Sequence, residues 1–249
     1  MAAHYHSGSV IETFLPGNNL LSALRGPDLA LLRPHLRAVQ ASAGTVLYDP
    51  GQTVQTAYFP CYRTLVSFLV PVGEDGTVEA LLVGREGAVG GIVSDGDLPS
   101  FARIVIQTGG DLLALPVSVL DECKMQSRPI ATLFARYADC LAAQMFQTAA
   151  CNAAHSIEQR TAKWIIAVIE RTGARDVPLT QERLATMLGV GRSYISRVIG
   201  TFKRDGTLGV RRGHLLVKDE AALRARACMC HDAVKQHFHK VLKGVYPDS

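Results

Sequence analysis

The residues best suited to chemistry lie on one face of a helix that the sequence predicts to start near Arg192. Apolar residues recur on this helix at spacings of three and four, which turns them inward: Ile195, Val198, Ile199 and Phe202. The opposite face carries Arg192, Ser193, Ser196, Arg197, Gly200 and Lys203. Arginine can donate two hydrogen bonds to a guanine edge in the major groove, and serine can donate to a base or a phosphate. We therefore expect Arg192 and Arg197 to read bases in double-stranded DNA, with Ser193 and Ser196 assisting.

Another helix and a short turn precede this helix. Thr180 is suited to cap a helix that runs to Leu188, and residues 189–191 read Gly-Val-Gly. Glycine tolerates the positive φ that a sharp corner between helices demands. Ala185 is small where the two helices must approach. Two helices joined by a short turn that contains glycine form a helix-turn-helix, whose second helix enters the major groove.

The residues that follow predict a β-hairpin, or wing, over 207–217, with Arg211 and Arg212 at its tip. Contacts to phosphate fix the position of a protein on DNA without reading its sequence. We assign this role to four residues: Gln181, Lys203, Arg211 and Arg212. The alternative for the whole segment is an ordinary pair of helices with a solvated basic face.

Charge is divided unevenly along the chain. Residues 1–154 contain 9 Lys and Arg and 13 Asp and Glu, a net charge of −4, whereas residues 155–249 contain 17 and 9, a net charge of +8. A basic C-terminal part is typical of a module that binds a polyanion. The acidic N-terminal part is expected to serve another purpose.

N-terminal to this basic part, the sequence predicts β-strands first and a long helix after them. Short apolar runs bounded by Gly, Asp and Pro predict strands of a small barrel or roll over 45–48, 57–59, 64–70, 78–83, 104–107 and 112–115. Residues 129–155 then have helical spacing, with Ile130, Leu133, Phe134, Tyr137, Leu141 and Met145 along one seam. A further helix is predicted over 156–172, and its stripe and its single tryptophan, Trp164, are expected in the core.

These elements predict an α+β chain with an N-terminal β-roll (a double-stranded β-helix, similar to a jelly roll), a long dimerisation helix and a C-terminal winged helix-turn-helix. The long helix has no obvious second layer to cover its seam, so we expect it to pack against its twin in a homodimer, the alternative being the roll alone. The expected division is 18–125 for a roll that resembles cyclic-nucleotide-binding domains, 126–155 for the dimerisation helix, 156–222 for the winged helix-turn-helix and 223–249 for a C-terminal helical extension.

A roll, a long helix and the motif LTQERLATMLGVGRSYISRVI together resemble the Crp/Fnr family of bacterial transcription regulators. The resemblance covers about residues 18–220 and is strongest in the C-terminal part. It implies a homodimer on a two-fold symmetric DNA site, with an effector in the roll that changes the angle of the DNA-binding domains. RNA polymerase is a further candidate partner. Arg192 and Arg197 match two arginines of the family's second helix, and Ser193 stands where the family has a glutamate, so the target sequence should differ from that of the cyclic-AMP receptor.

The roll departs further from the cyclic-nucleotide binders of the family. Gly91 stands where their glutamate contacts the ribose, and Ser100 and Phe101 stand at their Arg-Ser pair for the cyclic phosphate. Arg103 could substitute or point to solvent. We therefore expect an effector other than cyclic AMP. The oxygen-sensing branch holds an iron–sulfur centre with N-terminal cysteines, but no cysteine precedes Cys61, which argues against that cofactor.

The densest set of soft metal ligands is Cys228, Cys230 and His231, with His237 and His239 nearby. On a continuous helix Cys228 and His231 share a face and Cys230 points away, so metal binding would need a kink or a second chain. Metal binding and thiol redox sensing remain alternatives to core packing, which we favour, so no metal or cofactor is predicted. Cys140 and Cys151 on the long helix could form disulfides between subunits, but packing is favoured there too.

Composition excludes several classes of protein. With 249 residues, 48% hydrophobic and 19% charged, the chain can bury a core and is not disordered. We see no membrane span and no secretory signal, so we expect a cytoplasmic protein with no membrane partner. No catalytic constellation emerges, and an enzyme is not expected. The interpretation is a sequence-specific DNA-binding transcription regulator; the alternative is a module that responds to a small molecule, a metal or redox state and acts through a protein partner.

Overall fold

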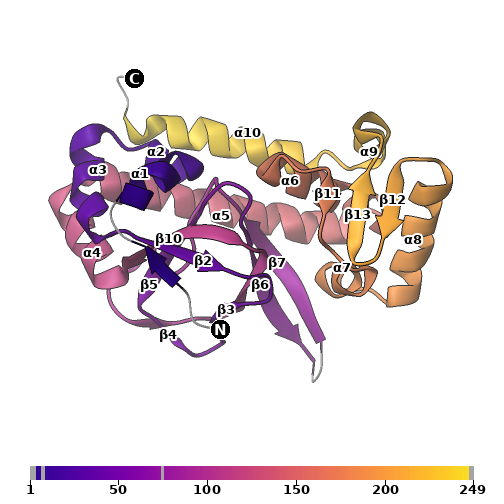
Figure 1. Ribbon diagram of the computed structural model, residues 1–249, viewed down its shortest axis with the longest axis horizontal. Coiled ribbons are helices and arrows are strands. Elements are labelled where there is room, and N and C mark those ends of the chain that lie inside the picture. The colour runs from indigo at the N-terminus through magenta and orange to yellow at the C-terminus, as the bar shows by residue number, and fades with distance from the viewer. Residues whose placement is uncertain (1–3, 7–8, 74–75, 247–249) are drawn as a thin grey trace.

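The computed structural model describes residues 4–6, 9–73 and 76–246. Figure 1 shows the β-strands of the N-terminal part at one end, the three C-terminal strands with their helices at the other, and two long helices that run side by side between them. This is the mixed fold that the sequence predicts, with a roll, a long helix and a winged helix-turn-helix. Among the described residues no helix combines the length and the apolar character that a membrane span requires.

The N-terminal part pairs its strands into two four-stranded antiparallel sheets, in the orders β1-β2-β10-β5 and β3-β9-β6-β7, and one short pair, β4-β8. The strands are β1 (His4–His6), β2 (Arg37–Ala41), β3 (Val46–Tyr48), β4 (Thr53–Val54), β5 (Thr56–Pro60), β6 (Leu65–Val72), β7 (Gly76–Val83), β8 (Leu98–Pro99), β9 (Arg103–Thr108) and β10 (Gly110–Pro116). Helices α1 (Ser9–Phe14), α2 (Asn19–Ser22) and α3 (Gly26–Leu32) precede β2.

Apolar side chains fill the inside of the roll. Val66 in β6 lies opposite Ile106 in β9, and both are fully buried. In the other sheet Leu113 lies opposite Phe59, again with no exposed surface. Because successive residues of a strand point to opposite faces, these pairs anchor the register of both sheets.

Helix α4 (Val117–Gln126) leads from the roll into α5 (Arg128–Ala154). The Ser127 side chain caps α5 by accepting a hydrogen bond from the Ile130 amide at 3.2 Å. Tyr137 in the middle of the helix is buried, and its hydroxyl both donates to the Ala88 carbonyl and accepts from the Ala88 amide, each at 3.0 Å. These contacts hold α5 against the roll.

The structure corrects the expected role of the apolar seam on α5. Its residues Ile130, Leu133, Phe134 and Tyr137 are buried within one chain. The C-terminal helix α10 (Cys230–Leu242) runs back along α5 (Figure 1) and supplies the second layer, with the Phe238 ring 6.2 Å from that of Tyr137. A covering layer from the distant C-terminus cannot be recognised from local spacing. What α5 leaves at least partly open is a neighbouring stripe that shares Met145 with the seam: Ala135, Ala138, Ala142, Met145, Phe146 and Ala149.

The C-terminal part contains α6 (Ile157–Thr172), β11 (Asp176–Val177), α7 (Gln181–Leu188), α8 (Arg192–Arg204), β12 (Leu208–Arg211), β13 (His214–Val217) and α9 (Glu220–Arg226). The expected boundary at residue 222 falls inside α9. A break at His155 and Ser156 separates α5 from α6, and Ser156 and Gln159 form a reciprocal capping box that starts the new helix. Helix α6 is buried on nearly all sides because the helix-turn-helix packs on it together with roll residues such as Leu65 and Leu82.

The hairpin of β6 and β7 in the roll also contacts the turn of the helix-turn-helix. Gly189 ends α7 in the left-handed region at φ 66°, and a Cβ atom there would lie 3.1 Å from a Val78 methyl of β7. Gly173 ends α6 at φ 65°, and a Cβ atom there would meet nothing within 4 Å. The two glycines share a conformation and differ in their surroundings.

This difference predicts unequal effects of two matched substitutions. Gly173→Ala should lower the free energy of unfolding by about 1 kcal/mol, because an L-residue is strained in the left-handed region. Gly189→Ala should lower it by about a further 1 kcal/mol, because the Val78 side chain must move. Urea unfolding measures both. Equal losses would show that α7 does not pack against the roll in solution.

Candidate nucleic-acid interface

Caps and glycines position α7 and α8 as the sequence predicts. The Thr180 hydroxyl accepts a hydrogen bond from the Arg183 amide at 3.2 Å and starts α7. Gly189 ends α7, and Gly191 is the N-cap of α8. Ala185 is 4% exposed, and such a small side chain lets two helices lie close together. The chain therefore reverses within three residues between the helices.

The two faces of α8 have opposite environments. Ile195, Val198, Ile199 and Phe202 are all buried in the core shared with α6 and α7. The residues of this helix that are predicted to read bases or to assist in base readout are all exposed: Arg192, Ser193, Ser196 and Arg197. Lys203, predicted to contact phosphate, is exposed further along the same helix. The structure thus brings the predicted contact residues together on one open surface.

Two contacts hold this surface in shape. The Ser196 hydroxyl donates to the Gln181 side-chain oxygen at 2.9 Å and links α8 to the first turn of α7. The Arg197 guanidinium lies over the Tyr194 ring, 5.1 Å from its centroid. Tyr194 is 43% exposed, and sequence reasoning missed it. Its spacing of three from Arg197 is the signal that could have revealed the pair.

The wing is built by β12 and β13, which pair antiparallel around Gly213 at φ 74°. Arg211 and Arg212 are exposed, as expected. Arg211 forms an ion pair with Asp176 of β11, and His214 Nδ1 lies 2.8 Å from the other oxygen of that carboxylate. The aspartate restrains Arg211 close to the sheet. This contact depends on a strand 35 residues earlier and could not be predicted.

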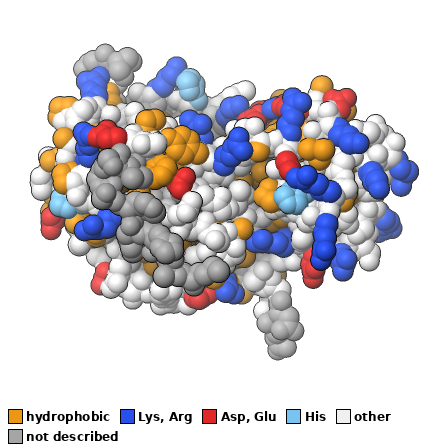
Figure 2. Space-filling model, in the orientation of Figure 1, with side chains coloured by type: hydrophobic (Ala, Val, Ile, Leu, Met, Phe, Trp, Pro, Cys, Tyr) orange, Lys and Arg blue, Asp and Glu red, His pale blue; other side chains and the backbone are white. Residues whose placement is uncertain are grey.

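A hollow separates the wing from the helices. Its lining joins the N-terminus of α7, the start of α8 and the wing: Thr180, Gln181, Arg192, Val210, Arg211 and Arg212 are among its residues. Figure 2 shows Lys and Arg side chains gathered over the end of the molecule that Figure 1 labels α8 and β12. A concave basic surface with helix N-termini at its edge is suited to the phosphate backbone of DNA.

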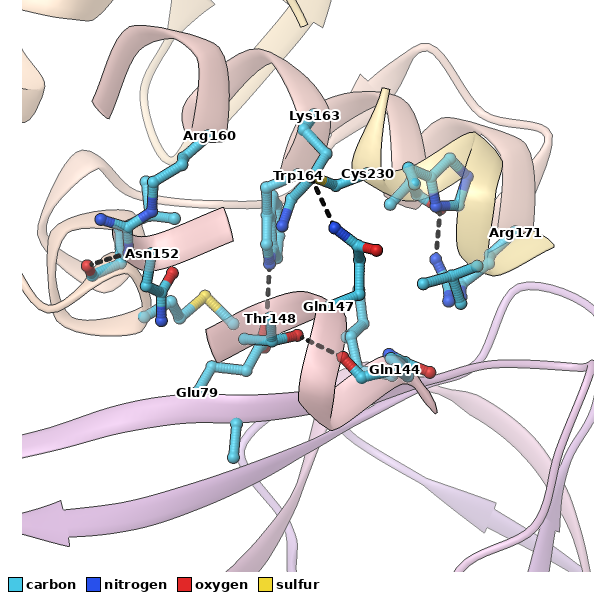
Figure 3. Close-up of a pocket in the computed structure, with 17 residues that line it drawn as sticks. Glu79, Gln144, Gln147, Thr148, Asn152, Arg160, Lys163, Trp164, Arg171 and Cys230 are labelled. Carbon is cyan, nitrogen blue, oxygen red and sulfur yellow. Dashed lines mark hydrogen bonds between the residues drawn. The ribbon is translucent and has the colours of Figure 1, made fainter. Parts of the chain in front are cut away.

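A polar pocket lies where the roll, α5, α6, α7 and α10 meet (Figure 3). Trp164 of α6 is buried there, as predicted, and its indole N–H donates to the Glu79 carboxylate of β7 at 2.7 Å. The Ser67 hydroxyl donates to the other carboxylate oxygen at 2.6 Å. Burial raises the pKa of Glu79 to about 6, against the effect of these hydrogen bonds. Arg171 and Glu86, 2.6 Å apart, add an ion pair between α6 and the roll.

The roll positions singled out for a cyclic nucleotide have other contacts. Gly91 lies at φ 51°, and a Cβ atom there would be 2.4 Å from a Val117 methyl. Phe101 is 84% exposed, and the Ser100 hydroxyl donates to the Ala102 carbonyl at 2.7 Å. Arg103 pairs with Asp49 at 3.2 Å on the outside of the roll. These side chains form no anchor for a cyclic phosphate.

Cys228 and His231 do not share a helix face, as they would on a continuous helix. The chain between α9 and α10 is not helical, so His231 turns to Glu170, with 3.0 Å between Nε2 and the carboxylate. Cys228 instead lies 3.6 Å, sulfur to sulfur, from Cys151 at the end of α5, and Cys230 lies beside it. His237 and His239 are exposed on α10. Cys140 is fully buried within its own chain, as is Cys151, so neither is placed for a disulfide between subunits.

Comparisons with known proteins agree with this geometry. Residues 159–226 match the family model described as the Crp-like helix-turn-helix domain. Among curated proteins no relative matches. Solved structures share the fold, among them a putative Crp/Fnr regulator from Eubacterium rectale, which is 16% identical, with 83% of this chain and 96% of that chain covered and a TM-score of 0.65. FixK2 from Bradyrhizobium japonicum is 11% identical, with 77% of this chain and 96% of that chain covered and a TM-score of 0.65. The c-di-GMP-responsive regulator CLP from Xanthomonas campestris is 16% identical, with 78% of this chain and 100% of that chain covered and a TM-score of 0.62. The resemblance drawn from the sequence is confirmed.

The raised pKa of Glu79 predicts a pH-dependent gain from Glu79→Gln. A carboxyl whose pKa is higher in the folded state stabilises that state at low pH, and this contribution is lost as the pH rises from the ordinary pKa of 4.5 through about 6. The variant should therefore unfold like the wild type near pH 4 and gain about 2 kcal/mol at pH 7.5. Thermal unfolding at both pH values measures this, with the exposed loop variant Asp97→Asn as the control. A gain that is equal at both pH values would contradict the assignment.

Proposed function

We propose that this chain, which has the fold of the Crp/Fnr regulators and carries a Crp-like helix-turn-helix domain, is a sequence-specific DNA-binding transcription regulator that acts as a homodimer. The observation that carries the proposal is the division of α8 into a buried apolar face and an exposed face with two arginines and two serines. A helix held in this way can enter a major groove without losing its own core.

We assign base readout to Arg192 and Arg197 and assistance to Ser193 and Ser196. Tyr194 supports Arg197, because a guanidinium stacked on a ring samples fewer conformations. Gln181, Lys203, Arg211 and Arg212 are assigned to phosphates. Arg212 is the sharpest test among them, because Arg211 has the Asp176 carboxylate as a competing partner.

The open stripe on α5 supports the homodimer. Phe146 is 74% exposed and Met145 is 45% exposed, although both lie in the middle of a 27-residue helix. Alanines at 135, 138, 142 and 149 continue the stripe, and small side chains let a second helix approach closely. We propose that the same stripe of a second copy covers this surface, which would place two recognition helices on a two-fold symmetric site.

The roll is proposed as a sensor domain whose effector is not cyclic AMP. The support is the set of contacts at Gly91, Ser100, Phe101 and Arg103, none of which offers a cyclic phosphate an anchor. The division into a roll, a dimerisation helix, a winged helix-turn-helix and a C-terminal extension is part of the proposal. We also propose that the protein acts in the cytoplasm, where the DNA lies, and that it contacts RNA polymerase.

Two arginine variants test the DNA-binding role. Arg192→Ala should weaken binding to the selected site by about 1–3 kcal/mol and relax the preference at one base position. Arg212→Ala should weaken binding to all sequences alike and reduce the dependence of affinity on salt. Fluorescence anisotropy with a set of single-base variants of the site, at several salt concentrations, measures both. Equal losses from both variants that ignore sequence would contradict the assigned roles, and affinity that does not fall with salt would contradict DNA binding itself.

One charge on the open stripe tests the homodimer. Phe146→Glu should convert the dimer to a monomer, because two carboxylates would meet across the interface without partners. Phe101→Glu is the matched control, since Phe101 is 84% exposed in the roll, between β8 and β9. Sedimentation velocity gives the mass of each variant. If Phe146→Glu remains a dimer, α5 is not the interface.

A further inference from the structure

Four potential metal ligands converge where α5 ends. The ligand atoms of Cys151, His155, Cys228 and Cys230 all lie within 4.8 Å of one another. Cys151 lies in the last turn of α5, and His155 is the residue that caps the end of this helix, four positions later. Cys228 and Cys230 come from the non-helical linker and the first residue of α10. All three cysteines are buried.

The spacing of these atoms fits one ion in a tetrahedral site. Zinc lies about 2.3 Å from a thiolate sulfur and about 2.0–2.1 Å from an imidazole nitrogen, so tetrahedral angles put two sulfurs about 3.8 Å apart and a sulfur and a nitrogen about 3.5 Å apart. Cys151 and Cys228 have 3.6 Å between their sulfurs, and Cys230 Sγ lies 3.5 Å from His155 Nδ1. A disulfide would need about 2.05 Å.

We propose that Cys151, His155, Cys228 and Cys230 bind one Zn²⁺ ion in a closed structural site. Three thiolates and one imidazole are the donors that zinc prefers, and four protein ligands leave no open position for a substrate. The kink that sequence reasoning required for metal binding is present, because α9 ends at Arg226 and α10 begins at Cys230.

Two polar side chains direct hydrogen-bond donors at sulfurs of the cluster. Lys163 Nζ donates to Cys151 Sγ at 3.4 Å. Gln147 Nε2 donates to Cys230 Sγ at 3.1 Å, a contact that Figure 3 shows. Zn²⁺ with three thiolates has a net charge of −1, which a lysine beside it offsets. A protonated thiol is only a weak acceptor, so packed neutral thiols would gain little from these two donors. Hydrogen bonds of this kind orient ligands and tune metal affinity.

The place of the site in the fold gives it a consequence. The break between α5 and α6 lies at His155 and Ser156, so one ligand sits in the hinge itself. Arg160 in the first turn of α6 is buried and donates to the Leu188 carbonyl at 2.9 Å, at the end of α7. A zinc ion would tie the end of α5 to the start of α10 and set the direction in which α6 carries the helix-turn-helix. The proposal for the ion itself does not depend on DNA binding.

Metal content of the full chain tests the proposal. The protein is purified without a polyhistidine tag and without chelators, and zinc is measured by inductively coupled plasma mass spectrometry. We expect about one zinc per chain in the wild type and in Cys123→Ser and Cys140→Ser, whose cysteines are buried outside the cluster. Cys228→Ser and Cys230→Ser should lose it. Lys163→Met should keep the stoichiometry and bind zinc about 10–100-fold more weakly in a chelator competition.

Cobalt binding tests the site in the wild-type protein, so this test does not depend on whether the ligand variants fold. Wild-type protein stripped of metal and loaded with one equivalent of Co²⁺ should show the intense visible bands of a tetrahedral ion and thiolate-to-cobalt charge transfer in the near ultraviolet. Wild-type protein that contains no zinc and gives no such spectrum would overturn the proposal. So would zinc retained in Cys228→Ser, or a Cys151–Cys228 disulfide in the protein as purified under reducing conditions.

Discussion

The burial of one face of α8 is the constraint on which the rest of the structure depends. Ile195 and Phe202 have no exposed surface, and each large apolar side chain removed from water contributes about 1.5–3 kcal/mol. A rotation of α8 by one residue would expose this face and bury Arg192 or Arg197 without a partner, which costs several kcal/mol more. The orientation of the arginines toward solvent is therefore set by the apolar residues on the other side of the same helix.

The orientation of the whole helix-turn-helix is set by α6. This helix is buried against the winged helix-turn-helix and against the roll hairpin, which explains why Trp164 finds its hydrogen-bond partner, Glu79, in the other part of the chain. The hairpin also contacts the turn between α7 and α8 through Val78 and Gly189. A change in the roll would reach α8 through these contacts. The cysteine and histidine cluster lies at the break between α5 and α6, where such a movement would pivot.

Local pattern was sufficient for the two helices of the helix-turn-helix and for the face of α8, because a period of 3.6 residues and a glycine turn are properties of a short segment. It did not reveal β2, β4 or β8. It was sufficient for the strands over 104–107 and 112–115, which β9 and β10 contain. It failed where a distant segment decides the outcome. The seam on α5 was assigned to a second copy because nothing in its own sequence reveals α10. Cys151 and His155 lie 77 and 75 residues from the cysteines that they approach, so no spacing could join them.

Selection of DNA from sheared genomic fragments tests the central claim most directly. The purified protein, kept reduced and free of chelators, is mixed with the fragments, and the retained DNA is sequenced. The account predicts an enriched, two-fold symmetric motif whose half-sites lie about one helical turn apart. Retention of DNA with no enriched motif, or no retention by a folded dimer in the presence and absence of a cell metabolite extract, would contradict a sequence-specific regulator and favour a module that acts through a protein partner.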